Sequence, residues 1–165
     1  MQSDRTTAYL LLGSNLGDRE KMIADAITFI NARVGDVLHL SGLYETAAWG
    51  NTDQPSFLNL VLAVETVLSP NKLLEAVLKI EADLGRVRHD KWGARLIDID
   101  IIFYGEEVIS QPPQLQIPHP EMQRRRFVLL PLAEIASTFV HPIFKKTVAN
   151  LLEDLSDNLS VQLRQ

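Results

Sequence analysis

Two aspartates, Asp98 and Asp100, stand in the otherwise apolar stretch of residues 97–103. In a β-strand, residues two apart point to the same face, which places the two Cβ atoms about 7 Å apart. Neighbouring carboxylates repel each other and need a counter-charge. A hard cation such as Mg²⁺, with substrate phosphates completing its coordination, would supply it. The alternative is a half-exposed strand whose polar residues face water.

A basic loop comes directly before this acidic pair and carries Arg86, Arg88, Lys91 and Arg95. Arginine forks bind phosphate oxygens in pairs, and a metal ion neutralises the charge that develops during phosphoryl transfer. A loop of this kind beside two carboxylates therefore suggests a polyphosphate ligand. Trp92, in the same loop, could stack on a base or anchor the loop.

Glu81 and His119 are two further candidates. Glu81 follows Val77 by four residues, which places it on the apolar seam of a predicted helix. There it could orient a loop arginine or meet the ligand, or it could lie at the helix edge and reach water. His119 lies between Pro118 and Pro120, close in sequence to residues 124–126, all arginines. A phosphate contact and a purely structural or exposed histidine are both open for it.

Hydrophobic periodicity predicts the elements that must position these residues. Apolar runs and alternation predict strands at residues 7–12, 37–44, 57–66 and 97–103. Residues 45–56 are expected to form a long loop, residues 13–15 a turn, and residues 106–109 a hairpin partner of the last strand across Gly105.

Apolar residues at three- and four-residue steps predict the helices. Asp18 is expected to cap the first helix, which Gly35 ends, and Ser69 with Pro70 to begin the second, which Gly85 ends. Shorter helices are expected at residues 128–136 and 148–155. The resulting order β-α-β-β-α-β predicts an α+β, ferredoxin-like core with an extra hairpin strand and C-terminal helices, the sheet being flanked by helices. That fold hosts many functions.

Composition narrows the class of protein. The chain has 165 residues, with 16 Lys and Arg against 21 Asp and Glu, so its net charge is −5. This balance argues against a protein that coats nucleic acid. There is no cysteine, no apolar run long enough for a membrane span, no signal-peptide pattern and no P-loop motif. We therefore expect one cytoplasmic domain over residues 1–165, without nucleic-acid or membrane partners.

The stretch of residues 91–102, KWGARLIDIDII, resembles the signature of the 6-hydroxymethyl-7,8-dihydropterin pyrophosphokinases of folate biosynthesis. Further motifs of that family follow its order and together cover roughly residues 7–135. They are Gly13 to Gly17, Tyr44 to Thr46, Asp53 to Pro55, Phe57 to Asn59, Ile80 and Glu81, Gly85 to Arg88, and Pro118 to Pro120.

The resemblance implies transfer of the pyrophosphoryl group of ATP to the pterin hydroxymethyl, with release of AMP. It implies that Asp98 and Asp100 bind two Mg²⁺ ions. It also implies a set of residues that hold or stabilise ATP, of which Arg86 and Arg95 are expected to be catalytic together with the two aspartates: Arg86, Arg95, Glu81, Arg88, Trp92, His119 and Arg125.

By the same resemblance, a second set forms the pterin pocket: Thr46, Ala48, Trp49, Phe57, Asn59 and Phe127. A flat heteroaromatic ring needs aromatic walls and polar groups at its edge. Phe57 and Phe127 could sandwich the ring, and Asn59 could orient it. Members of the family are commonly monomers, which is the expectation here. The alternatives are a non-catalytic ferredoxin-like nucleotide- or RNA-binding module and a degenerate member that binds pterin without transfer.

Overall fold

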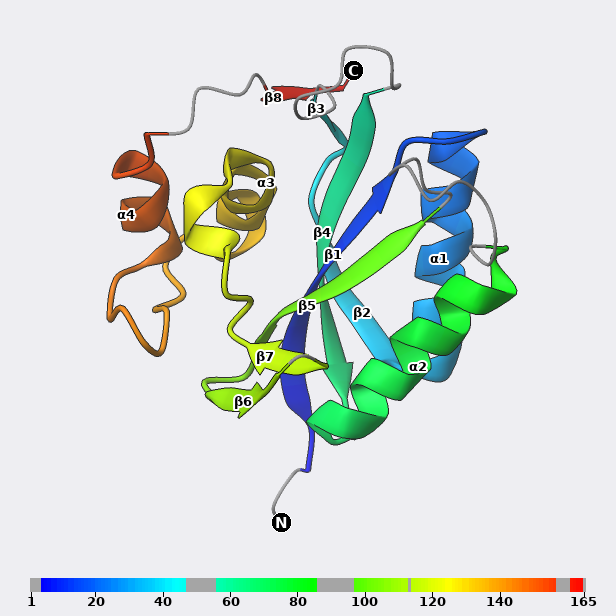
Figure 1. The fold of residues 1–165 in the computed structure, drawn as a ribbon, viewed down its shortest axis with the longest axis horizontal. Coiled ribbons are helices and arrows are strands. Elements are labelled where there is room, and N and C mark those ends of the chain that lie inside the picture. The colour runs from blue at the N-terminus through cyan, green and yellow to red at the C-terminus, as the bar shows by residue number, and fades with distance from the viewer. Residues whose placement is uncertain (1–3, 47–55, 86–96, 113, 157–160, 165) are drawn as a thin grey trace.

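The computed structural model describes residues 4–46, 56–85, 97–112, 114–156 and 161–164. At its centre is a six-stranded sheet in the order β5 (Asp98–Tyr104), β1 (Thr6–Ser14), β4 (Phe57–Thr66), β3 (Tyr44–Thr46) and β8 (Val161–Leu163), with β2 (Gly35–Leu40) also pairing β4. All these pairs are antiparallel. Together with the crossing helices, this order is the ferredoxin-like arrangement, so the predicted fold class is confirmed (Figure 1).

Two helices, α1 (Arg19–Arg33) and α2 (Pro70–Asp83), cover one face of the sheet (Figure 1). Both begin at their predicted caps, because Asp18 accepts a hydrogen bond from the Lys21 backbone N and Ser69 accepts one from the Lys72 backbone N. Their apolar faces pack with alternate strand residues into one buried cluster, which includes Leu10, Leu12, Ile30, Leu62, Val77 and Ile80.

The opposite face carries α3 (Arg126–Ala136) and α4 (Val148–Glu153). Their bounds are close to those of the two predicted C-terminal helices. Here Leu11 and Val61 pack with the helices into a second buried cluster. An irregularity in the β1–β5 pairing contributes, because Leu10 pairs with Ile101 but Tyr9 pairs with Phe103. The intervening Ile102 is an extra residue, and both Ile102 and Phe103 join the second cluster.

The predicted strand at residues 37–44 is divided into β2 and β3 by a break at Ser41. The Ser41 backbone N donates to the Val61 carbonyl (2.9 Å), while its Oγ accepts from the Val61 backbone N (3.0 Å). Glu134 of α3 binds the residues that follow the break, because its Oε1 accepts hydrogen bonds from Gly42 N (3.0 Å) and Tyr44 Oη (2.7 Å). Burial and this hydrogen bond raise the pKa of Tyr44 to about 12.

The predicted hairpin between the last strand and residues 106–109 is wrong. Gly105 has a φ of +52° and donates its N–H to the Thr7 carbonyl, and the chain then leaves the sheet. The strand that follows, β6 (Ile109–Gln111), pairs with β7 (Leu115–Ile117) in a separate two-stranded sheet. The outer edge of β5 is thus open to other partners, and the Ile102 carbonyl accepts a hydrogen bond from the His119 backbone N (3.0 Å).

Two further features differ from the sequence-based expectations. Gly13 and Ser14, predicted to lie in a turn, are the last residues of β1. The C-terminal β8, which no periodicity indicated, pairs with β3. Among the described residues, no helix has the length and apolar character needed to cross a membrane.

Candidate active site

Asp98 and Asp100 lie at the start of β5, the end strand of the sheet. Asp98 is half-buried and Asp100 is exposed, whereas Ile97, Ile99 and Ile101 are buried in the cluster beneath α1 and α2. The two carboxylates therefore share the face opposite these helices, in the geometry that their spacing predicts.

Glu81 joins α2 to the same strand. It is only 5% exposed, and its Oε2 accepts a 2.7 Å hydrogen bond from the backbone N of Ile99, between the two aspartates. Because β5 ends the sheet, an N–H on its outer edge has no neighbouring strand as a partner. The carboxylate takes that role, and the interpretation of Glu81 as a residue that reaches out to water is wrong.

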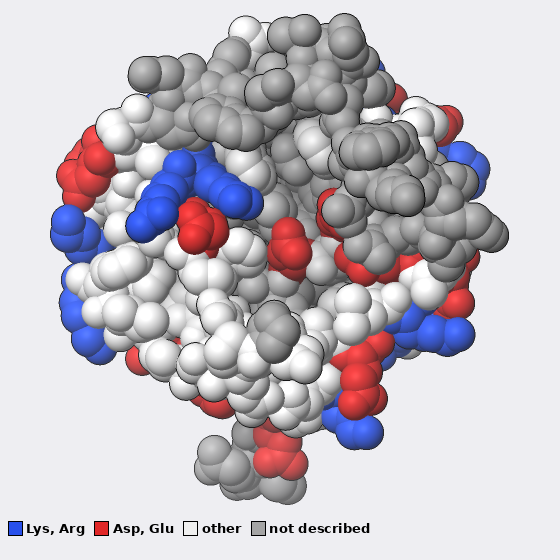
Figure 2. Space-filling model, in the orientation of Figure 1, with Lys and Arg blue, Asp and Glu red and all other residues white. Residues whose placement is uncertain are grey.

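A cavity of about 670 Å³ opens beside these carboxylates, within the range of small-molecule sites. It is lined by Leu74, Leu78, Glu81, Asp98, Ile99, Asp100, Ile101, Pro112, Gln114, Leu115, Gln116, His119 and Pro120. Figure 2 shows acidic side chains near the centre of this face and a group of Lys and Arg side chains to their left. The described lining residues include three carboxylates and no Lys or Arg. A polyphosphate could therefore bind beside these carboxylates only together with cations that offset the negative charge.

The donor chemistry of the cavity suits Mg²⁺. Within the described ranges, no group of three or more acidic or histidine side chains is arranged to hold a metal ion. Magnesium at phosphate-transfer sites, however, is typically held by one or two carboxylates, with phosphates and waters as the remaining ligands. Asp98 and Asp100, on one face of a strand and in the wall of the cavity, fit that mode.

His119 lies in the cavity wall and follows the cis peptide bond between Ile117 and Pro118. Its Nδ1 accepts a hydrogen bond from the Glu121 backbone N (3.1 Å), so the neutral ring carries its proton on Nε2. Burial lowers the pKa of His119, and the charge of Arg125 lowers it further, against the opposing effects of Asp100 and Glu121. Near neutral pH, His119 is therefore a neutral Nε2–H donor.

Arg125 and Phe127 lie on either side of the start of α3. The Arg125 guanidinium is 5.7 Å from the centroid of the Phe127 ring, and its charge reaches His119. The neighbouring Arg124 is the last residue of the 3-10 helix η2 (Met122–Arg124). It instead pairs with Glu121 (3.4 Å), which directly precedes this helix. The structure thus brings Arg125 close enough for its charge to act on the histidine.

A row of three residues crosses the sheet on the same face as the aspartates. Gly13 pairs with Asn59 on one side and with Asp98 on the other. With strands spaced about 4.8 Å apart, the Asn59 and Asp98 backbones are about 10 Å from each other. A Cβ on Gly13 would come within 2.7 Å of Asn59 Oδ1, so glycine keeps the floor between them open. Gly13 was predicted to lie in a turn, and its role in this row was not predicted.

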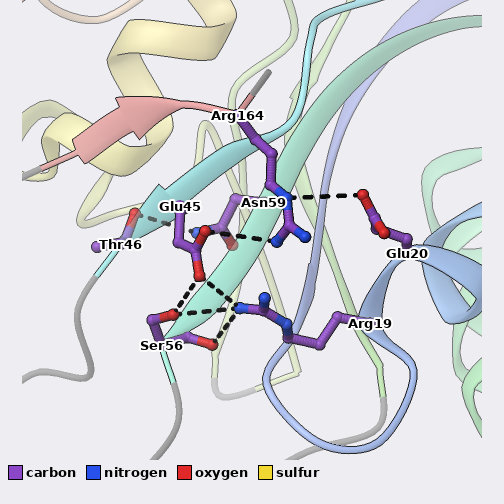
Figure 3. Close-up of polar contacts among 7 residues, drawn as sticks. All are labelled: Arg19, Glu20, Glu45, Thr46, Ser56, Asn59 and Arg164. Atoms are coloured by element: carbon purple, nitrogen blue, oxygen red, sulfur yellow. Dashed lines mark hydrogen bonds and ion pairs between the residues drawn. The ribbon is translucent and has the colours of Figure 1, made fainter.

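Thr46 and Phe57, which pair across β3 and β4, extend this surface. Asn59 and Thr46 are both buried, and Asn59 Nδ2 donates to Thr46 Oγ1 at 3.5 Å (Figure 3). Phe57 is half-buried, as is Phe127 on α3. Four of the six residues predicted for the pterin pocket are thus described on or above one face of the sheet.

The remaining predicted site residues lie outside the described residues: Ala48, Trp49, Arg86, Arg88, Trp92 and Arg95. Their roles stay predictions.

Comparison with known proteins identifies the family. The model of the 7,8-dihydro-6-hydroxymethylpterin-pyrophosphokinase family matches residues 9–137. A 2-amino-4-hydroxy-6-hydroxymethyldihydropteridine pyrophosphokinase of Methylorubrum extorquens is 48% identical over 136 residues, which cover 82% of this chain and 85% of that protein. An enzyme of the same name from Haemophilus influenzae is 39% identical over 158 residues, 95% of this chain and 98% of that protein.

Among solved structures, the HPPK-DHPS of Plasmodium falciparum superposes with a TM-score of 0.73 at 17% identity. The match covers 90% of this chain but 44% of that longer chain, and it supports the fold alone. The sequence relatives and the family model, which spans most of the chain, establish more. The chain belongs to the 7,8-dihydro-6-hydroxymethylpterin-pyrophosphokinase family.

Proposed function

We propose that the cavity beside Asp98 and Asp100 is the centre at which this chain carries out the reaction of its family. As a member, the chain is an enzyme of folate biosynthesis that transfers the pyrophosphoryl group of ATP to the hydroxymethyl of 6-hydroxymethyl-7,8-dihydropterin and releases AMP. The placement of both aspartates on one face of β5, in the wall of a cavity, is the observation that carries the proposal.

In this proposal Asp98 and Asp100 would hold two Mg²⁺ ions, whose chemistry would be to neutralise phosphate charge and to lower the pKa of the attacking hydroxyl. The protein does the positioning: it fixes the two carboxylates on a strand whose backbone Glu81 anchors at Ile99. The hydroxymethyl oxygen can then approach the β-phosphorus in line, with AMP as the leaving group.

The ATP side of the cavity is assigned to His119 and Arg125. The Nε2–H of a neutral His119 donates to a phosphate oxygen, while Nδ1 stays occupied by the Glu121 N–H. Arg125 supplies positive charge close by. By resemblance, Arg86, Arg88, Trp92 and Arg95 would complete the triphosphate site.

The pterin side is assigned to the surface built from β3, β4 and α3. Asn59 and Thr46 supply hydrogen-bonding groups for the edge of the ring, and Phe57 and Phe127 supply aromatic walls. The open floor at Gly13 lets the ring lie between Asn59 and Asp98, which directs its hydroxymethyl toward the aspartates. By resemblance, Ala48 and Trp49 belong to the same pocket.

We further propose that residues 1–165 act as a single catalytic domain, as a monomer and in the cytoplasm, with ATP and the pterin as partners and no nucleic acid. The net charge of −5 and the acidic cavity support small phosphorylated ligands held with cations rather than a long polyanion. The family membership does not favour the alternative of a non-catalytic binding module.

The test is the release of AMP from ATP and Mg²⁺, with and without 6-hydroxymethyl-7,8-dihydropterin. AMP that forms only with the pterin is the expected result. ADP as the product would indicate transfer of the γ-phosphoryl group and would contradict the mechanism. Pterin binding without turnover would point to a degenerate member, and neither binding nor turnover would overturn the proposed function.

A further inference from the structure

Glu45 lies in β3 between Tyr44 and Thr46, and its side chain is on the opposite face from theirs. Tyr44 reaches Glu134 on α3, whereas Glu45 reaches Arg19 at the start of α1 on the other side of the sheet. Neighbouring side chains in a strand point to opposite faces. The contacts of Glu45 on one face therefore fix the backbone that carries Thr46 on the other face. Thr46 is one of the residues assigned to the pterin pocket.

Three segments that are distant in the sequence converge on the Glu45 carboxylate (Figure 3). Its Oε2 accepts from Arg19 Nη1 at 2.9 Å and from Ser56 Oγ at 2.6 Å. Its Oε1 lies 3.4 Å from Nη1 of Arg164, the residue that follows β8. We call these four residues, Arg19, Glu45, Ser56 and Arg164, the Glu45 cluster.

The contacts inside the Glu45 cluster reinforce one another. Arg19 Nη1 also donates to the Ser56 carbonyl (3.0 Å) and to Ser56 Oγ (3.1 Å), so one guanidinium nitrogen joins α1 to both residues. Arg164 Nε lies 3.6 Å from Glu20 of α1, and its backbone N donates to the Leu43 carbonyl (2.7 Å). The hydrogen bond from Ser56, then that from Arg19, lowers the pKa of Glu45, which keeps it charged near neutral pH.

The Glu45 cluster is placed where β3 most needs support. β3 has only three residues and therefore few backbone hydrogen bonds of its own. Its register with β4 places Thr46 opposite Phe57 and Tyr44 opposite Asn59. Ser56 directly precedes Phe57, the first residue of β4. The Glu45–Ser56 hydrogen bond therefore joins β3 to β4 at the end of the pairing that carries Thr46 and Phe57, two of the proposed pterin contacts.

We propose that Glu45 is a positioning residue for the pterin: with Arg19, Ser56 and Arg164, it holds Thr46 and Phe57 in the register that pterin binding requires. This inference rests on the proposed function. The Glu45 cluster joins β3 and the start of β4 to α1, and β1 separates these strands from β5, so the cluster acts on Thr46 and Phe57 and leaves the metal and ATP side unchanged.

The experiment compares Glu45→Ala, Glu45→Gln and Ser56→Ala with Asp25→Ala, which removes the exposed α1 pair Lys21–Asp25 (2.9 Å) and touches no residue of the cluster. The pterin Kd is measured by calorimetry, and kcat and both KM values by AMP release. For Glu45→Ala we expect the pterin Kd and KM to rise about tenfold, which corresponds to about 1.4 kcal/mol. The ATP KM should change less than about twofold, well below the tenfold step of 1.4 kcal/mol.

Glu45→Gln keeps an oxygen acceptor for Arg19 and Ser56, so it should recover part of the lost pterin affinity, and Asp25→Ala should behave as the unmodified chain. An unchanged pterin Kd in Glu45→Ala, or equal losses for pterin and ATP, would overturn the inference. If Glu45→Ala does not fold, Ser56→Ala decides, because an unchanged pterin Kd there would also overturn it. Absence of pterin-dependent AMP release by the unmodified chain would instead overturn the proposed function.

Discussion

Substitutions of Asp98 and Asp100 are expected to change the proposed catalysis without changing the stability of the fold. Both aspartates lie on the face of β5 opposite α1 and α2, while the isoleucines on the other face hold the strand in the core. Replacing a half-buried or exposed carboxylate by its amide changes little volume and leaves the buried isoleucines in place. The effect should therefore appear in catalysis and not in stability.

For Asp98→Asn and Asp100→Asn, each tested alone, we expect kcat to fall by about 100-fold or more, as when one group that stabilises transition-state charge is removed. The double variant should show no measurable transfer. The assay is AMP release at saturating Mg²⁺, and urea unfolding should give an unchanged midpoint. Asp25→Asn, an exposed helix aspartate, is the matched control and should keep full activity. Retained activity in the double variant would contradict the metal assignment.

Gly13 offers a test of the pterin side at a single atom. Gly13→Ala places a Cβ 2.7 Å from Asn59 Oδ1, so the Asn59 side chain must move. We expect the pterin KM to rise between about 10- and 100-fold, because a displacement of about 1 Å in a positioning group has costs of that order. Steady-state kinetics with each substrate varied in turn would measure it. The ATP KM of the same variant is the internal control, and an equal rise there would speak against the assignment.

At the scale of the elements, α2 and β5 are linked by the Glu81–Ile99 hydrogen bond. Glu81→Ala leaves a buried N–H without this acceptor, and we expect the free energy of unfolding to fall by about 1–3 kcal/mol. Glu81→Gln keeps an oxygen that can accept and should lose less. Urea unfolding measures both. Glu75→Ala, at an exposed position of the same helix, should stay within about 0.5 kcal/mol of the unmodified chain. Equal stability of Glu81→Ala and Glu75→Ala would contradict the anchoring role.

The elements that the sequence predicts well are those whose signals are local. The predicted strand at residues 57–66 has the bounds of β4, and α1 and α2 begin at the capping residues because a cap acts within three residues. The break at Ser41 could not be predicted, since it depends on Val61, twenty residues away. The hairpin failed for the same reason: the Gly105 N–H bonds to Thr7, and a positive φ turns the chain away from β5.

The candidate site divides in the same way. The shared face of Asp98 and Asp100 follows from the two-residue repeat of a strand, so the sequence suffices for it. The partner of Glu81 does not follow, because it is a backbone N–H in another element. Gly13 and the Glu45 cluster were missed for a related reason: their roles come from the register of β4 against its neighbours and from a C-terminal strand of three residues. Such short, long-range pairings leave no periodic signal.

At the scale of the whole molecule, the sheet separates two buried clusters. His141 lies beside Phe103, a member of the second cluster. The residue is 2% exposed, its ring is 5.7 Å from that of Phe103, and its Nδ1 accepts from the backbone N of Ile143 and of Phe144. Burial lowers the pKa of His141 below its ordinary value of 6.5. In the pH range between the two values, the unfolded chain binds more protons than the folded one.

The protein should therefore lose stability as the pH falls below 6.5, with full stability above that value. The burial of His119 acts in the same direction. Urea unfolding at pH 7.5 and 5.5 tests this, and the loss should be smaller in His141→Gln. His39→Gln, at an exposed position of β2, is the matched control and should keep the loss of the unmodified chain. A pH response that is identical in all three chains would contradict the role of His141.

The row Asn59, Gly13 and Asp98 has a consequence for how chains of this kind can change in length. β1 is paired on both sides, so a single residue inserted before Gly13 would turn the following part of the strand over against both neighbours at once. Another residue would then take the place of Gly13 between Asn59 and Asp98, and Gly13 would move to the opposite face of the strand. Insertions and deletions should therefore accumulate in the connections between elements, while the number of residues from Leu10 to Gly13 stays constant across descendants that keep the activity.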